Sequence, residues 1–335
     1  MTLNVGVIGV GMIGQDHIRR LTTVLAGANV VAVSDVNAKQ AKEVAARLPG
    51  AKAYPTGEDL IEAREVSAVV VTSWGPTHAA YVLAAIRAGK PVFCEKPLAD
   101  TERDCSAIID AEAAFGRRLV QVGFMRRFDS QYRAMKETIL SGAIGAPLLF
   151  QSVHRNPSVS SHYTKDMALT DTAVHDIDIA RFLFDDEPAT ISVRVPRKNS
   201  FGGELSDPLF TLIEMRSRAL VAIETSVNIA YGYDIRGEVV GERGVVTLAE
   251  RNDVLVKANG VYSGRVPVDW RERFGAAFDA EFREWLAAAA KGGAAGSSSW
   301  DGYVATVVST LGVKAIESGR REPINLSERP ALYAS

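Results

Sequence analysis

The stretch "GVIGVGMIG" at residues 6–14 decides the fold class of this chain. Its glycines follow the spacing G-x-G-x-x-G and are Gly9, Gly11 and Gly14. An apolar run at 3–8 comes directly before the turn, and a helical pattern at 12–26 follows it. The first glycine of such a turn allows a tight bend, and the third lets the helix pack closely on the strand. The stretch therefore predicts the first strand, turn and helix of a parallel α/β sheet.

Strand and helix patterns keep alternating as far as residue 124. The apolar strand runs are "LNVGVIGV" (3–10), "NVVAVS" (29–34), "SAVVVTS" (67–73), "PVFCEK" (91–96) and "LVQVGF" (119–124). Helical segments lie between them at 12–26, 37–48, 76–88 and 101–115. Continuous apolar strands that alternate with amphipathic helices indicate a parallel sheet covered on both faces. We expect residues 1–124 to form a doubly wound Rossmann domain.

The pattern changes in the second half of the chain. Strand runs there follow one another through short turns: "LLFQSVHR" (148–155), "ATISVRVPR" (189–197), "LFTLIEMRS" (209–217), "ALVAIETSV" (219–227), "RGEVVGERGVVTLAE" (236–250) and "DVLVKA" (253–258). Such strands predict a mainly antiparallel sheet. Helical segments are expected at 168–184, 274–290 and 300–318. Residues 125–335 are therefore predicted to form a second domain, of the α+β class.

The overall composition limits the classes of partner and compartment. A chain of 335 residues is long for one core, which agrees with two domains. The net charge of −2 gives no electrostatic reason to expect nucleic acid or an anionic membrane as a partner. No apolar run is long enough for a membrane helix, and the N-terminus has the pattern of a first strand. With only two cysteines, Cys94 and Cys105, we expect reduced thiols in a cytoplasmic protein.

The glycine turn and the acid after the second strand predict a nicotinamide cofactor. Gly11 lets backbone approach a pyrophosphate, and the N–H groups at the helix N-terminus bind the phosphates. Asp35 follows Gly14 by about 20 residues, the position from which a carboxylate accepts hydrogen bonds from ribose hydroxyls. It would also repel a 2′-phosphate, and Val36 and Asn37 bring no arginine. NAD is therefore favoured over NADP. The structural alternative is that Asp35 only caps the next helix.

Lys96 stands at the carboxyl end of a predicted parallel strand, in "VFCEKPLA" (92–99). Ligands of open α/β sheets lie at such strand ends, so Lys96 is expected near the nicotinamide, where it can stabilise negative charge on a substrate oxygen. The alternative is an ordinary surface lysine. From their places on the turn and strand ends, we also expect these residues to contact the cofactor: Met12, Ile13, Val36, Ser73, Trp74, His78 and Glu95.

The ten residues "TDTAVHDIDI" (170–179) hold three aspartates and one histidine. On a helix, Asp171 and His175 stand at i and i+4 and project from one side. Three interpretations are open at this point. The pair could merely stabilise the helix, form part of a metal site with His154 and His162, or act as an acid/base pair. Histidine is the natural base when an alcohol proton must leave together with a hydride.

Taken together, the motifs resemble the Gfo/Idh/MocA oxidoreductase family. The resemblance rests on "GVIGVGMIG", "SDVN" (34–37), "WGPTH" (74–78), "CEKPLA" (94–99), "GFMRRFD" (123–129) and "DTAVHDID" (171–178), and it runs nearly from end to end. It is closest to the myo-inositol 2-dehydrogenase branch through "SVHRNP" (152–157), "DTAVHDIDIARFL" (171–183), "DWRERF" (269–274) and "WDGYVAT" (300–306). The resemblance implies a Rossmann domain, an open-faced sheet domain and assembly as a homotetramer through those sheets.

The resemblance also implies an activity and its residues. It implies NAD-linked oxidation of a ring hydroxyl on a small polyol or sugar. Such NAD chemistry needs no metal, and no compact H-x-x-x-H or C-x-x-C pair supports the metal interpretation. The catalytic lysine, aspartate and histidine of the family fall on Lys96, Asp171 and His175. Substrate contacts fall on Arg126 or Arg127, with Arg127 preferred, and on His154, Asn156 and Tyr233. The expected reaction is oxidation of myo-inositol with His175 as the base. The alternatives are another cyclitol or an aldose as substrate, or a non-catalytic NAD-binding regulator.

Overall fold

The computed structural model describes residues 2–249 and 254–334, which divide into two compact units. Unit 1 holds the chain up to Met125, the segment Phe278–Thr306 and the residues from Ser327 on. Unit 2 holds Arg126–Ala277 and Val307–Leu326. The expected boundary near residue 124 is close to the first of these divisions. The two later segments of unit 1 differ from the expected domain 125–335, because Phe282, Trp285 and Leu286 join the core of unit 1.

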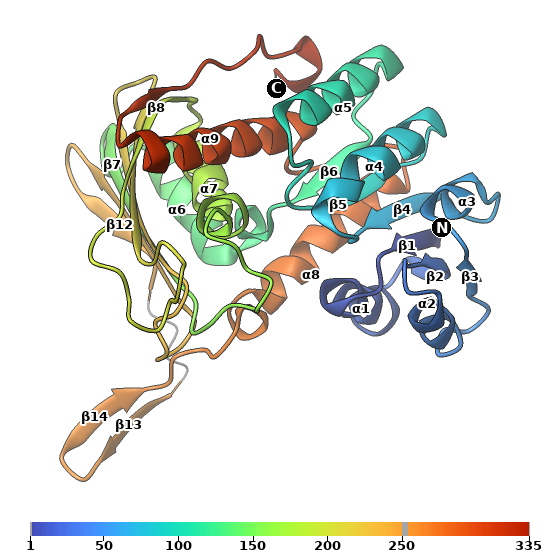
Figure 1. Ribbon diagram of the computed structural model, residues 1–335, viewed down its shortest axis with the longest axis horizontal. Helices are drawn as coiled ribbons and strands as arrows, with labels where there is room; N and C mark the ends of the chain where they lie inside the picture. The colour runs from blue at the N-terminus through green and yellow to red at the C-terminus, as the bar shows by residue number, and fades with distance from the viewer. Residues whose placement is uncertain (1, 250–253, 335) are drawn as a thin grey trace. The chain divides into compact units, whose positions relative to one another are not determined.

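Unit 1 is built on a six-stranded sheet in the order β3-β2-β1-β4-β5-β6 (Figure 1). The strands are β1 (Leu3–Ile8), β2 (Ala28–Ser34), β3 (Lys52–Tyr54), β4 (Ala68–Val71), β5 (Val92–Glu95) and β6 (Val120–Gly123). All neighbours in the sheet run parallel, which confirms the predicted doubly wound fold. The prediction missed β3 and α3 (Gly57–Glu62), which are too short to show a period of their own.

Capping side chains mark the start of some, but not all, of the helices of unit 1. They are α1 (Met12–Arg19) with the π-helical turn η1 (Arg20–Val24), α2 (Ala38–Ala45), the 3-10 turn η2 (Gly75–Thr77) before α4 (His78–Arg87), and α5 (Glu102–Phe115). Asn37 caps α2 by accepting from Gln40 N, and Thr101 caps α5 by accepting from Asp104 N. The C-terminal part of unit 1 ends in the 3-10 turn η5 (Ala331–Tyr333). Each predicted helical segment contains one of these helices.

Unit 2 is built on a seven-stranded sheet in the order β12-β11-β7-β10-β9-β8-β15. The strands are β7 (Pro147–Arg155), β8 (Pro188–Arg194), β9 (Leu209–Met215), β10 (Leu220–Ser226), β11 (Asp234–Gly241), β12 (Val245–Thr247) and β15 (Glu322–Pro323). Neighbours run antiparallel except β7 and β10, so the predicted mainly antiparallel sheet is confirmed. The ends of the two predicted strands that fall at 250–253 lie outside the described residues.

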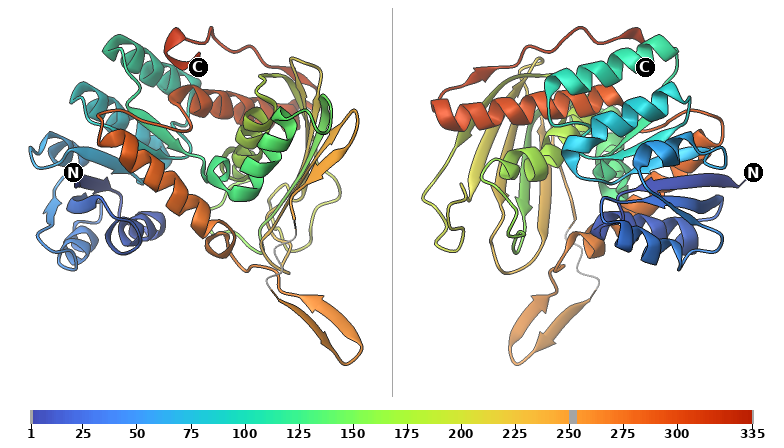
Figure 2. Two further views of the ribbon diagram at one scale, coloured as in Figure 1. Left: turned by 180° about the vertical axis from the view of Figure 1, so that it is seen from behind. Right: turned by 45° about the vertical axis from the view of Figure 1, so that its right-hand side comes forward.

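The helices of unit 2 cover one face of this sheet, as Figures 1 and 2 show. They are the 3-10 turn η3 (Met125–Phe128), α6 (Ser130–Leu140), the π-helical turn η4 (Ala168–Ala173) and α7 (Val174–Phe184). A separate hairpin, β13 (Leu255–Ala258) and β14 (Val261–Gly264), is exposed along its whole length. Two helices, α8 (Trp270–Ala289) and α9 (Ser299–Ser318), begin in one unit and end in the other. No helix in the described residues is both long and apolar enough to span a bilayer.

Candidate functional site

The glycine turn of unit 1 forms an open cradle for a phosphate group. Gly9 has a φ of 92°, and a Cβ there would lie 2.5 Å from Ser73 N, so only glycine fits. A Cβ on Gly14 would lie 2.0 Å from Gly9 O, which explains the close packing of α1 on β1. A Cβ on Gly11, by contrast, would meet nothing within 4 Å. Because no side chain caps α1, its first N–H groups are left for an anion, and the cradle fits a dinucleotide pyrophosphate.

Asp35 stands beside this cradle at the carboxyl end of β2. Its Oδ2 accepts from Val10 N at 2.7 Å and its Oδ1 accepts from Asn37 N at 2.8 Å. The capping role that was the alternative for Asp35 belongs to Asn37 instead. The carboxylate is therefore held next to the glycine turn, where a ribose bound behind the pyrophosphate would present its hydroxyls. The neighbouring Val36 is fully exposed and brings no positive charge for a 2′-phosphate.

The ends of β4 and β5 are joined by a buried histidine. His78 begins α4, and its Nδ1 lies 2.7 Å from Pro97 O while its Nε2 lies 2.9 Å from Ser73 O. This bridge ties together the loop that carries Ser73 and the loop that carries Lys96. Trp74, next to Ser73, is 78% exposed and leaves an aromatic surface open at the same edge of the sheet. The bond between Lys96 and Pro97 is cis.

Lys96 is half-buried, directly after the last residue of β5. Its backbone N–H donates to Oε2 of the buried Glu95 at 3.1 Å. The expected cofactor residues Gly9, Asp35, Ser73 and Lys96 thus all lie on the turns that follow β1, β2, β4 and β5. These are the strand ends where open α/β sheets bind ligands.

In unit 2, Asp171 and His175 lie on either side of a change in helix type. The predicted helix at 168–184 is present, but it starts as the π-helical turn η4, which carries Asp171, and continues as α7, which carries His175. Tyr163 Oη lies 2.6 Å from Thr172 Oγ1, and this hydrogen bond ties η4 to the segment that precedes it. His175 is 9% exposed and Asp171 is half-buried. Single π-helical turns are frequent at functional sites, where they reorient one side chain relative to the helix.

The two later aspartates of this segment are ion-pair partners. Asp176 accepts from Arg126 Nη1 at 2.6 Å and from Ser152 Oγ at 2.6 Å, and all three side chains are buried. Burial alone would raise the pKa of Asp176, but Arg126 and then His154 outweigh it and hold this pKa well below its usual range. Asp178 binds Arg127 through both oxygens, the shortest contact being 2.6 Å. These two acids therefore anchor α7 from its buried side.

A group of aromatic and basic side chains gathers beside His175. The ring of His154 lies 6.3 Å from the ring of His175 and 5.9 Å from that of Tyr233, centre to centre. Nδ1 of His154 lies 2.8 Å from Arg126 Nη2 and 2.9 Å from Asp176 Oδ2. Asn156 follows β7, two residues after His154.

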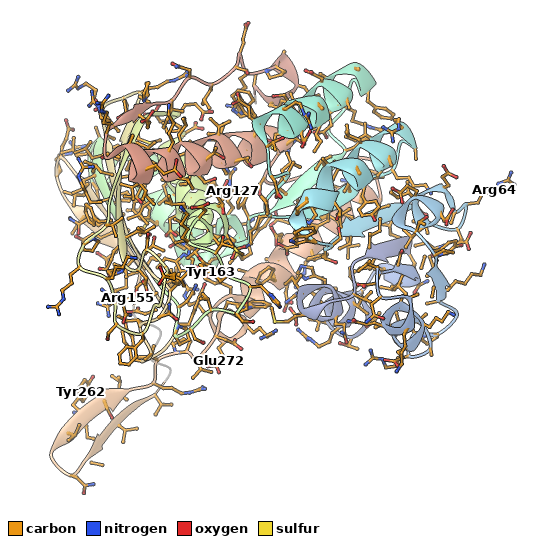
Figure 3. The ribbon with its side chains drawn as sticks, in the orientation of Figure 1. Arg64, Arg127, Arg155, Tyr163, Tyr262 and Glu272 are labelled. Atoms are coloured by element: carbon orange, nitrogen blue, oxygen red, sulfur yellow. The ribbon has the colours of Figure 1, made fainter. Side chains whose placement is uncertain are left out.

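The structure places Arg126, and not the preferred Arg127, beside His154. Arg127, labelled in Figure 3 together with Tyr163, binds Asp178 and lies over the ring of Phe182. The two neighbouring arginines point to different partners because η3 turns the chain between them. Sequence reasoning also missed Ser152 and Asp176. The alternation of β7 was the available signal, since it puts Ser152 and His154 on the same buried face.

Comparison with family models identifies both halves of the chain. Residues 3–124 match the model described as the oxidoreductase family, NAD-binding Rossmann fold, and residues 132–247 match the Gfo/Idh/MocA C-terminal domain. The chain belongs to the Gfo/Idh/MocA oxidoreductase family. As a member of this family it is an oxidoreductase whose first unit is an NAD-binding domain, in agreement with the glycine cradle and Asp35.

Full-length relatives of this Gfo/Idh/MocA member carry one description. An inositol 2-dehydrogenase 3 of Saccharopolyspora erythraea is 52% identical over 99% of this chain and 98% of the relative. An inositol 2-dehydrogenase of Azotobacter vinelandii is 51% identical over 100% of this chain and 99% of the relative. A crystal structure of myo-inositol dehydrogenase from Lactobacillus casei, in complex with NAD(H) and myo-inositol, has a TM-score of 0.97 and 36% identity and covers 99% of this chain and 100% of that one.

The histidines that a metal site would need lie in other surroundings. In residues 2–249 and 254–334, no group of three or more His, Cys, Asp or Glu side chains is arranged to hold a metal ion. His154 instead contacts Arg126 and Asp176, and His162 is exposed.

Proposed function

We propose that this chain is an NAD-dependent inositol 2-dehydrogenase that oxidises the 2-hydroxyl of myo-inositol to a ketone. The single observation that carries the proposal is the full-length identity above 50% with relatives of that description. The cluster of His154, His175 and Tyr233 in unit 2 supports it, because a polyol needs several donors and acceptors in one place. The glycine cradle and Asp35 of unit 1 fit NAD.

In the proposed reaction, His175 takes the proton of the hydroxyl while the carbinol carbon loses its hydride and becomes a carbonyl. Bound NAD supplies the hydride acceptor. Lys96 stabilises the negative charge that develops on the oxygen, and Asp171 orients the imidazole and stabilises its charged form. Arg126, His154, Asn156 and Tyr233 are the proposed contacts to the other ring hydroxyls. Arg127 is proposed to act on α7 through Asp178.

We further propose that the protein works as a homotetramer in the cytoplasm. The helices of unit 2 lie on one face of its sheet (Figure 2). The other face carries apolar side chains that are exposed in the single chain. Phe210, Leu212, Leu220 and Val245 are 37–56% exposed on this outer face. An apolar face of this kind on a folded chain marks a protein interface. The cytoplasmic location is supported by Cys94 and Cys105, which are both free and buried.

Reduction of NAD in the presence of a panel of polyols tests the proposed function. We expect NADH to form with myo-inositol, and to form more slowly or not at all with scyllo-inositol and glucose. Faster reduction with one of these would reassign the substrate and retain the mechanism. No reduction with any cyclitol or aldose, together with normal NAD binding, would establish the non-catalytic regulator instead.

Replacing His175 tests the proposed base. In His175→Ala we expect kcat with myo-inositol to fall by about a hundredfold to ten-thousandfold, the usual contribution of a general base. NAD affinity, measured by calorimetry, is expected to stay near the wild-type value, because the glycine cradle and Asp35 lie in unit 1. Turnover close to wild type would exclude His175 as the base.

A further inference from the structure

We propose that His17 is a positioning residue for Lys96 and acts through Glu95. The inference rests on the proposed function, because it assigns a role at the same catalytic centre. All the residues that carry it lie in unit 1. The motifs that indicate the cofactor and the catalytic residues did not include His17, although it lies on α1, directly behind the glycine turn.

The connection from His17 to Lys96 consists of two successive hydrogen bonds. His17 Nε2 lies 2.7 Å from Glu95 Oε1. The other carboxylate oxygen of Glu95, Oε2, accepts from the backbone N–H of Lys96 at 3.1 Å. The carboxylate therefore holds the backbone from which the Lys96 side chain extends, and His17 fixes the direction of that carboxylate. Any rotation of Glu95 moves both contacts together.

The neighbours of His17 determine its tautomer. Arg20 Nη1 lies 2.8 Å from His17 Nδ1, and a guanidinium can only donate, so Nδ1 is the acceptor. The proton of the neutral imidazole is then on Nε2 and is donated to Glu95. Burial lowers the pKa of His17 and outweighs the opposing effect of Glu95, which agrees with a neutral ring. The imidazole thus links the guanidinium of Arg20 to the carboxylate of Glu95, and it can do so in one orientation only.

Packing around the imidazole keeps this geometry rigid. His17 is 0% exposed, and the rings of Phe93, Phe278 and Phe282 lie 4.5–5.7 Å from its centre. Arg20 is held from its other side by Asp279, whose Oδ1 accepts from Nε at 2.7 Å. Aromatic contacts leave little room for water to replace the hydrogen bonds of His17.

The glycine at position 123 makes room for the carboxylate of Glu95. A Cβ at Gly123, the last residue of β6, would lie 3.1 Å from Glu95 Oε2. Apolar residues of equal volume stabilise a core as well as a buried ionic network does, so stability alone is a weak reason for burying His17, Arg20 and Glu95. Precise placement of a catalytic backbone is a better reason, because small displacements at a reacting centre cost rate.

Two substitutions of His17 separate positioning from packing. His17→Phe keeps an aromatic ring among Phe93, Phe278 and Phe282 but removes both hydrogen bonds. His17→Gln keeps an N–H donor near the position of Nε2, the atom that contacts Glu95. We expect His17→Phe to lower kcat with NAD and myo-inositol by on the order of tenfold to a hundredfold, with little change in KM or in NAD affinity. His17→Gln is expected to recover most of this loss.

A matched control removes a buried hydrogen bond elsewhere in unit 1. Tyr333 is 2% exposed and donates to Glu112 Oε2 at 2.8 Å. Tyr333→Phe is expected to lower the melting temperature and leave kcat unchanged. Equal losses of kcat in Tyr333→Phe and His17→Phe would reduce the effect to general destabilisation and overturn the proposal.

The path through Lys96 is tested by combining substitutions. In a Lys96→Met background, His17→Phe should lower the remaining turnover little further, because the residue that it positions is already gone. A loss as large as in the wild-type background would show that His17 acts by another route.

A readout without turnover distinguishes this inference from the proposed function. Glu95–Lys96 is the only Glu–Lys pair in the sequence, so labelling glutamate carbonyls with ¹³C and lysine amides with ¹⁵N selects the Lys96 amide signal in NMR. His17→Phe should shift this signal, His17→Gln should largely restore it, and Tyr333→Phe should leave it in place. An unshifted signal in His17→Phe overturns the positioning role. A shifted signal in a protein that oxidises no polyol would keep the connection to Lys96 while the proposed function fails.

Discussion

Asp176 lies next to the proposed base in the chain and is fully buried, with Arg126, Ser152 and His154 as its partners. Its carboxylate neutralises a guanidinium that is only 1% exposed. Breaking such a pair by removing one charge leaves the other charge buried without compensation. We therefore expect Asp176→Asn to lower the free energy of unfolding by about 3–5 kcal/mol, measured by urea denaturation at neutral pH. The control Glu43→Gln, in an exposed pair with Lys39, should change it by less than about 1 kcal/mol.

The same carboxylate gives the protein a predicted acid sensitivity. The pKa of Asp176 is held below its ordinary value of 3.8, so the unfolded chain binds its proton at a higher pH than the folded chain does. The stabilising contribution of Asp176 is therefore complete above pH 3.8 and is lost as the pH falls toward the folded-state pKa. Wild type should lose stability below this pH more steeply than Asp176→Asn. Parallel pH profiles of the two proteins would contradict this assignment.

At the scale of elements, two glycines at the junction of β1 and α1 are expected to have different roles, Gly14 in stability and Gly11 in cofactor binding. A Cβ on Gly14 would strike a backbone carbonyl, so Gly14→Ala is expected to lower the stability of the cofactor-free protein by about 1–3 kcal/mol. A Cβ on Gly11 would meet open space, so Gly11→Ala should leave that stability nearly unchanged. It should weaken NAD binding by about tenfold or more, because the methyl group would project into the open cradle where we propose that the pyrophosphate binds. Calorimetry and thermal denaturation without NAD measure the two effects, and an equal loss of stability in both variants would refute the distinction.

The elements that the sequence predicts correctly are those with a strong local signal. The strand–glycine–helix stretch at 6–14, with the alternating strand and helix patterns that follow it, predicted the parallel sheet, and the succession of strand runs joined by short turns predicted β7–β11. The three-residue strand β3, the π-helical turn η4 and the parallel pairing of β7 with β10 left no pattern, because they depend on tertiary contacts. The same holds for α8, whose later half packs in unit 1 although it follows the second sheet in sequence.

Within the candidate site, the residues of the motifs could be predicted, but the residues that contact them could not. The family, the fold and NAD as cofactor were predicted and are confirmed. The roles of Lys96, Asp171 and His175 stay predictions. The sequence motif favoured Arg127 over Arg126 as a substrate contact, and only the fold shows that Arg126 meets Asp176 and Arg127 meets Asp178. His17 and Glu95 are 78 positions apart, so their contact was beyond the reach of any local pattern.

At the scale of the whole molecule, the helices of unit 2 cover only one face of its sheet, and side chains on the other face are exposed in the single chain. Strand registers place Leu212 of β9 opposite Ala222 of β10 and Ser192 of β8, and they place Leu220 of β10 opposite Leu149 of β7. Alternation puts these side chains on the face away from Ile213 and Val221, which are buried under the helices. Glu214 and Glu224 lie on the same outer face, where they pair with Arg321 and Arg155. The outer face therefore combines apolar side chains with ion pairs, and it is the surface proposed to join the subunits.

A charge placed in the middle of this outer face should dissolve the proposed tetramer. Leu212 is 37% exposed in the single chain, so Leu212→Glu costs the isolated subunit little, whereas burying an unpaired carboxylate between two sheets is strongly unfavourable. We expect sedimentation velocity to give four times the chain mass for wild type and smaller species for Leu212→Glu, with the far-ultraviolet circular dichroism spectrum unchanged. Phe115→Glu is the matched control, because Phe115 is similarly exposed, at 41%, but lies on α5 in unit 1. A wild-type monomer, or an intact tetramer in Leu212→Glu, would mean that this face does not join the subunits, and the apolar rows of β9 and β10 would then need another explanation.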